Sequence, residues 1–141
     1  MNVQEMSIID EQVLIVPGTL PQLNDVIRRS KGHWSSYHKD KKETENKIKV
    51  CILSQKMKKI EGPVFLHFSW TSKNARVDPD NIAFAKKFLL DALVTEQILP
   101  GDGRGVVKGW IDEFPDPDPD NPRVEVVLYT IGDTDGDADS G

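Results

Sequence analysis

The chain has 141 residues, of which 38% are hydrophobic and 29% are charged, a composition typical of one soluble globular domain. No apolar run approaches the roughly 20 residues of a membrane span, and the first residues do not resemble a secretory signal, so we expect a cytoplasmic protein with no membrane partner. The net charge of −5 argues against a uniformly basic nucleic-acid-binding protein, but it hides a strong asymmetry along the chain.

The first elements predicted along the chain are a strand and a short helix. The apolar run at residues 12–16 ends at Pro17-Gly18 and predicts a strand followed by a turn. Residues 22–30 are expected to form a short helix, with Pro21 at its start. Residues 31–39 combine glycine, serine and aromatic residues without periodicity, which is typical of an exposed loop.

A basic helix is predicted next, from Asp40 to a Gly-Pro stop near residues 61–63. Residues 28–59 carry eleven Lys or Arg against three acids. An anionic partner responds to such a local patch within a Debye length of about 10 Å, although the segment could equally be an ordinary solvated helix. The single cysteine, Cys51, excludes an internal disulfide and is expected to pack in the core.

The second half of the chain alternates strands with one further helix. Strict alternation over residues 64–70 predicts a strand, and apolar residues at helical spacing predict a helix over residues 81–96. Residues 106–114 and 123–131 are expected to form two more strands. Residues 112–141 hold ten acids against one Arg, and the last ten residues lack any apolar anchor. We therefore predict one α/β domain over residues 1–131 and a disordered acidic tail over residues 132–141.

The motif Asp78-Pro79-Asp80-Asn81 lies between a predicted strand and a predicted helix, where α/β proteins often place functional groups. If Asn81 caps the helix, both carboxylates stay free and converge near its start. Two close carboxylates repel each other unless a cation lies between them, and hard oxygen ligands suit Mg²⁺ or Mn²⁺. The alternative is an ordinary loop with a helix cap. Asp102, in a glycine-rich turn just past the same helix, favours the metal site.

A lysine on the predicted helix completes a minimal set of groups for phosphodiester hydrolysis. Lys87 lies seven residues beyond Asp80, two helical turns on, and therefore on the same helix face. Asp91 follows four residues later and is expected to orient Lys87 through an ion pair rather than to bind metal. The same helix phase directs Lys86 towards solvent or the flank of the DNA.

The segment RVDPDNIAFAKKFLLDALVTEQILPGDGRGVVKGWIDEF, residues 76–114, resembles the RusA-type Holliday junction resolvase family, especially its branch in phages and prophages of Gram-positive bacteria. The resemblance extends to PGTLPQLNDVIRRS (17–30), GPVFLHFSW (62–70) and NPRVEVVLY (121–129). It implies a compact α/β domain of the α+β type, with a mixed β-sheet of about four strands packed with two main helices. It also implies a bacterial or prophage-encoded homodimer that acts on four-way DNA junctions.

The resemblance implies catalytic and metal-binding roles for Asp78, Asp80 and Asp102, with Mg²⁺, or alternatively Mn²⁺, as the cofactor. About one extra helical turn precedes the D-A-L motif (residues 91–93) in this chain. When the family is aligned from that motif, its catalytic lysine carries over onto Lys87, with Lys86 as the second choice.

The sequence departs from the family pattern at two places. Gly103 stands where several relatives carry a second acid, which puts a role for such a pair in doubt. Gly105-Val106 stands where close relatives often have an aromatic residue. The residues that we expect to contact DNA are polar or basic and come from the basic segment, the acidic loop and the helix: Asn24, Arg28, Arg29, Lys41, Lys42, Arg76 and Lys86.

We therefore expect a metal-dependent endonuclease that resolves four-way junctions by paired symmetric nicks as a homodimer. Part of the apolar surface of strand 64–70 and helix 81–96 is expected at the subunit interface. Two alternatives keep the fold: a flap or fork nuclease, and a non-catalytic protein that binds junctions.

Overall fold

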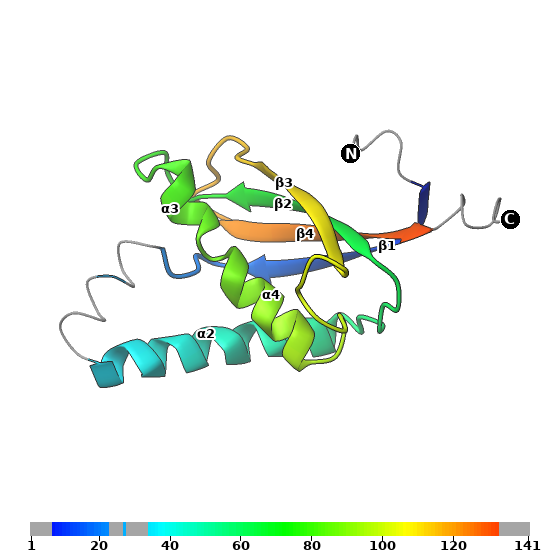
Figure 1. The fold of residues 1–141 in the computed structure, drawn as a ribbon. Coiled ribbons are helices and arrows are strands. Elements are labelled where there is room, and N and C mark those ends of the chain that lie inside the picture. Colours follow the sequence, from blue (N-terminus) through cyan, green and yellow to red (C-terminus); the bar gives the residue numbers. More distant parts are fainter. Residues whose placement is uncertain (1–6, 23–26, 28–33, 133–141) are drawn as a thin grey trace, which may run out of the picture.

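The computed structural model describes residues 7–22, 27 and 34–132, with side chains from residue 38 onward in the last range. The elements are β1 (Ser7–Pro17), α2 (Trp34–Ser54), β2 (Val64–Thr71), α3 (Pro79–Ala83), α4 (Lys86–Thr95), β3 (Val107–Glu113) and β4 (Arg123–Gly132) (Figure 1). Most of the helix expected over residues 22–30, including Asn24, Arg28 and Arg29, lies outside the described residues, as does the tail after Gly132.

The four strands form one mixed sheet in the order β1-β4-β2-β3. Strand β4 runs antiparallel to both β1 and β2, whereas β2 and β3 are parallel. The expected fold class, a mixed four-stranded sheet packed with two main helices, is confirmed. Because β2 and β3 are parallel, the loop that follows β2 and the loop that precedes β3 lie at opposite ends of the sheet.

The core lies between one face of the sheet and helices α2 and α4. Alternate residues of β2 point to this face, as the period of two in a strand requires. The fully buried side chains come from the sheet and from both helices: Leu14, Val16, Ile48, Ile52, Val64, Leu66, Phe68, Leu89, Leu93, Val126 and Leu128. Each such side chain contributes roughly 1.5–3 kcal/mol by leaving water. Cys51 packs against this core as predicted, and burial raises the pKa of its thiol while Lys47 partly opposes that shift.

Strand β2 and helix α4 use most of their apolar side chains in the core, so strand 64–70 and helix 81–96 offer little of the spare apolar surface expected for a dimer interface. The exposed apolar side chains lie elsewhere. Val13 and Ile15 of β1 and Ile111 of β3 face the opposite side of the sheet, which no helix crosses in the part of the chain that is described. Trp110 on β3 is also half exposed.

Helix α2 begins earlier and ends earlier than predicted. It starts at Trp34 rather than Asp40, and it ends at Ser54 instead of continuing to residues 61–63. The helix ends in a reversed turn, in which Lys56 has a positive φ of 55° and the N–H groups of Lys56 and Met57 donate back to Leu53 and Ile52. The Gln55 side chain accepts a hydrogen bond from the Ile15 N–H (2.9 Å) and donates one to the Ile15 carbonyl (2.7 Å). Gln12 on the same strand exchanges a similar pair of hydrogen bonds with the Lys58 backbone.

The helix predicted over residues 81–96 is divided into α3 and α4. Phe84 and Ala85 form the junction, where the Ala85 N–H donates to the Ile82 carbonyl (3.2 Å) and the Phe88 N–H donates to the Ala85 carbonyl (3.0 Å). These bonds close tighter turns than those of an α-helix. The helical path is therefore tightened at Phe84 and Ala85, although both residues keep right-handed helical backbone angles. None of the described helices is long and apolar enough to cross a membrane.

Candidate metal and DNA-binding site

The D-P-D-N motif forms the entrance to α3, at the carboxyl end of β2 (Figure 1). Asp78, with an extended backbone, is the N-cap residue, and its carbonyl accepts hydrogen bonds from the N–H groups of Asn81 and Ile82. Its side chain makes no capping hydrogen bond. Asp80 is exposed, and one of its carboxylate oxygens accepts only the adjacent Asn81 N–H (3.0 Å). The expected cap at Asn81 is therefore wrong, but the two carboxylates remain available as oxygen ligands.

Asp102 lies apart from this pair. It is exposed in the loop between α4 and β3, and Figure 1 shows that loop at the far end of α4 from α3. Helix α4 has ten residues and is therefore about 15 Å long. Across the described ranges 7–22 and 34–132, no three His, Cys, Asp or Glu side chains form a group that could hold a metal ion. One chain thus offers Asp78 and Asp80 together, and Asp102 separately.

Lys86, expected at the DNA flank, instead points inward, which corrects that assignment. Its side chain is 14% exposed, and Nζ lies 2.6 Å from Oδ2 of Asp112 on β3. The other oxygen of Asp112 accepts a hydrogen bond from the Trp70 indole N–H (2.8 Å). The ammonium also lies over the rings of Phe68 (5.2 Å to the centroid) and Trp110 (4.5 Å). Lys86 therefore ties the start of α4 to β2 and β3.

Sequence reasoning missed this arrangement because it depends on sheet register. Asp112 pairs with Phe68 across the parallel strands and so faces the helices together with Trp70. The alternation of β3 does place Asp112 on one face, but nothing local to residues 106–114 identifies which face the helices cover.

Lys87 lies on the outer side of α4, with a side chain 71% exposed. Its ammonium lies 3.7 Å from Asp91 Oδ1, the i,i+4 ion pair that the spacing predicts. The alignment of Lys87 with Asp80 by helical phase does not hold, because the two residues belong to different helices. Lys87 nonetheless remains the lysine of this pair that is open to a ligand.

The basic surface expected from residues 28–59 is present in the described part of α2. Lys42, Lys47 and Lys49 are exposed and Lys41 is partly exposed. The N-terminal half of α2 lies at the same end of the molecule as α3 (Figure 1). Arg76, two residues before Asp78, is also exposed, and its backbone N–H is held by the Asn74 side chain (3.0 Å). Arg76 is thus the cation nearest to the acidic pair along the chain, and the lysines of α2 lie at the same end of the molecule.

Comparison with known proteins adds no support for the resemblance described above, which rests on the segments of this sequence quoted for it. No protein-family model matches the chain, and no curated protein matches it either.

Proposed function

We propose that this chain is a magnesium-dependent endonuclease that nicks branched DNA, with four-way junctions as its preferred substrate. The observation that carries the proposal is the pair of exposed carboxylates, Asp78 and Asp80, at the entrance to α3, with the exposed Arg76 two residues before Asp78. Acids that face DNA would weaken a purely binding surface, because they repel phosphates. A metal ion that bridges the carboxylates and a phosphate would remove this repulsion. The resemblance to RusA-type resolvases supports the same activity.

The carboxylates of Asp78 and Asp80 fit a hard divalent cation, since both are exposed and neither is used in capping. Mg²⁺ held there would supply Lewis-acid polarisation of the phosphate and would lower the pKa of a coordinated water molecule. Lys87, held by Asp91 at 3.7 Å, would present its ammonium to charge that develops on the phosphate. Mn²⁺ is the alternative occupant, with the same ligands.

The third carboxylate would come from a second copy of the chain. Asp102 precedes β3, whereas the acidic pair follows β2. Because β2 and β3 are parallel and in register, Asp102 and the acidic pair lie at opposite ends of the sheet within one chain. The outer edge of β3 has no strand partner among the residues described. If two copies pair antiparallel through this edge, the start of each β3 meets the end of the other. Asp102 of one copy then approaches the end of the sheet that carries the acidic pair of its partner.

The same pairing would bury exposed apolar side chains on β3. Trp110 is 50% exposed and Ile111 is 42% exposed, although both lie within a strand. A two-fold dimer also explains paired nicking, because each of its two sites faces one of two symmetry-related DNA strands.

A cleavage assay tests the proposal directly. The purified protein is incubated with end-labelled four-way, forked and linear DNA, with Mg²⁺, with Mn²⁺ and with EDTA. We expect metal-dependent, symmetric nicks in the four-way junction. Preferential cleavage of forks or flaps would favour the second nuclease assignment, and tight junction binding without cleavage in either metal would favour a non-catalytic binding protein.

A further inference from the structure

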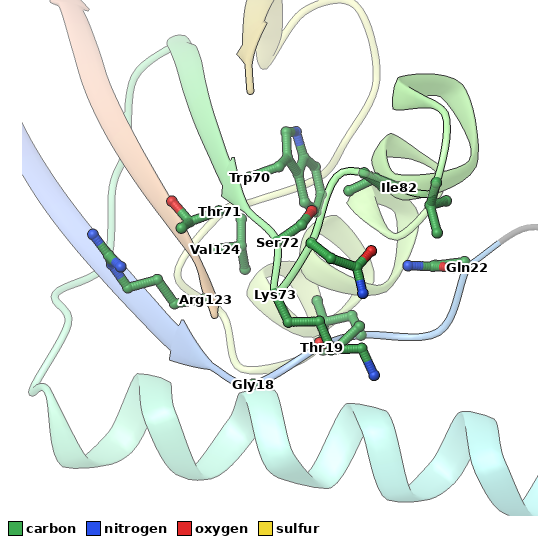
Figure 2. A pocket seen from close by; sticks show the side chains of 13 residues that line it. Gly18, Thr19, Gln22, Trp70, Thr71, Ser72, Lys73, Ile82, Arg123 and Val124 are labelled. Atoms are coloured by element: carbon green, nitrogen blue, oxygen red, sulfur yellow. The ribbon is translucent and has the colours of Figure 1, made fainter. Parts of the chain in front are cut away.

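A small cavity lies directly before the acidic loop, between the turn that follows β1 and the segment that follows β2 (Figure 2). Its volume is about 50 Å³. Buried side chains of Leu20, Trp70 and Val124 form part of its lining. The cavity suits a tetrahedral oxyanion better than a nucleobase because it is small. We call it the Lys73 cavity, after the basic residue between Ser72 and Asn74 in its lining.

The lining of the Lys73 cavity contains cations but no carboxylate, although the chain has 23 acids. Lys73 and Arg123 both line it. Arg123 is held by Glu125 (2.8 Å) and Asp118 (3.5 Å), whereas Lys73 forms no ion pair with any residue that the structure describes. Lys47 on α2 lies near Gly18 at one end of this lining, since a Cβ atom at Gly18 would lie 2.6 Å from the Lys47 ammonium. The lining therefore holds two basic residues and no acidic residue, and Lys73 is the one whose charge is not paired within the described chain.

Neutral hydrogen-bond donors complete the lining. Thr19 contributes a hydroxyl from one wall and Ser72 contributes one from the other (Figure 2). The Asn74 amide oxygen accepts the Arg76 N–H (3.0 Å), which fixes the amide and leaves its NH₂ group able to donate to another acceptor. An ammonium, two hydroxyls and an amide around a small hollow are the donors that bind phosphate oxygens.

We propose that the Lys73 cavity holds a backbone phosphate of the DNA strand that is cut, a few nucleotides from the scissile phosphate. The inference rests on the proposed nuclease function and names a subsite for it. The chain from Lys73 to Asp78 spans at most about 18 Å when fully extended. Successive phosphates along one strand of B-DNA rise about 3.4 Å, so the two positions fit on one continuous strand. Lys73 and Thr19 are then positioning residues, which fix the register of the strand over the acidic pair.

Two variants and a matched control test the subsite by binding alone. Junction affinity is measured by fluorescence anisotropy in Ca²⁺ over a range of KCl concentrations, for Lys73→Gln, Thr19→Val and Lys56→Gln. Lys56 is exposed beyond the far end of α2 and loses the same single charge. We expect Lys73→Gln to weaken binding about five- to tenfold and to lower the log–log salt slope by about 0.9. Thr19→Val should weaken binding two- to threefold, and Lys56→Gln should change it less than twofold.

A second experiment uses inorganic phosphate as the probe, with chloride at equal ionic strength as the control, in ¹H–¹⁵N NMR titrations. Phosphate should shift the amides of Thr19, Ser72 and Lys73 in the wild type and leave them unshifted in Lys73→Gln. If the wild type cuts junctions while Lys73→Gln behaves like Lys56→Gln and phosphate shifts none of these amides, the subsite is refuted and the nuclease stands. If phosphate binds here but no DNA is bound or cut, the anion site stands and the nuclease proposal fails.

Discussion

Replacing Lys86 by methionine should destabilise the protein far more than the same change at Lys87, its neighbour in sequence. Lys86→Met keeps most of the aliphatic stem but removes the ammonium that lies 2.6 Å from Asp112, whose side chain is 21% exposed. A hydrogen bond between charged groups contributes about 1.5–3 kcal/mol, and a cation over an aromatic ring adds about 0.5–1 kcal/mol. Burial of the methionine side chain costs less hydration free energy than burial of the lysine ammonium, and this difference offsets part of the loss. We expect the free energy of unfolding to fall by about 2–3 kcal/mol.

Urea denaturation followed by tryptophan fluorescence measures the effect, with thermal unfolding as a second readout. At this chain length 1 kcal/mol corresponds to roughly 4 °C, so the midpoint should fall by roughly 8–12 °C. Lys87→Met removes a pair at 3.7 Å from a side chain that is 71% exposed, and it should cost no more than about 0.5 kcal/mol.

A double-mutant cycle with Asp112→Asn separates the ion pair from general packing. Asparagine can still accept the Trp70 indole N–H, so the cycle reports mainly on the bond to Lys86. The two changes together should cost at least about 1 kcal/mol less than the sum of their separate costs. Equal costs at Lys86 and Lys87, or strict additivity with Asp112→Asn, would refute the inward role of Lys86.

Four further predictions concern activity and assembly. Asp80→Asn should abolish cleavage while junction binding is kept or strengthened, because the change removes both a metal ligand and a charge that repels phosphate; near wild-type cleavage would exclude this metal site. Lys87→Ala should slow single-turnover cleavage at least tenfold, about 1.4 kcal/mol in the barrier, with little change in the melting temperature; an unchanged rate would remove Lys87 from the chemistry. Replacing Lys41 and Lys42 by glutamine should flatten the salt dependence of junction affinity, each lost phosphate contact lowering the log–log slope by about 0.9; an unchanged slope would place the DNA surface elsewhere. Ile111→Lys should convert a dimer into monomers in sedimentation velocity, since two added cations would meet near the two-fold axis; a dimer of undiminished affinity would exclude pairing through β3.

Local pattern predicted most of the elements, and tertiary contacts decided where they end. Strand β2 matches its prediction because the alternating apolar residues Val64, Leu66, Phe68 and Trp70 are all buried in the core. The division at Phe84 and Ala85 could not be predicted, since apolar spacing continues across it. The end of α2 at Ser54 depends on a positive φ at Lys56, and lysine is a residue type that does not signal such a turn.

The candidate site could likewise be predicted only where its residues are neighbours in sequence. Asp78 and Asp80 are neighbours in sequence, so their proximity follows from the motif itself. Asp102 was grouped with them because it follows the same predicted helix, but a helix separates its two ends by its own length. The angle between Asp80 and each lysine directs Lys86 to solvent, but the buried Ala85, Leu89 and Leu93 place Lys86 at the edge of the core-facing side and Lys87 opposite it.

The hydrogen bonds from Gln55 to Ile15 also bear on how far the protein can assemble. An exposed edge strand is a template for further strands, and a sheet with two such edges can add subunits without limit. Here a side-chain amide already occupies the outward N–H and carbonyl of Ile15, so a strand approaching β1 would first have to displace Gln55. Growth through the sheet is therefore directed to β3 alone. Two copies joined there would expose only their β1 edges, where Gln55 already binds the backbone of Ile15. The assembly would therefore stop at a closed pair instead of continuing into a filament.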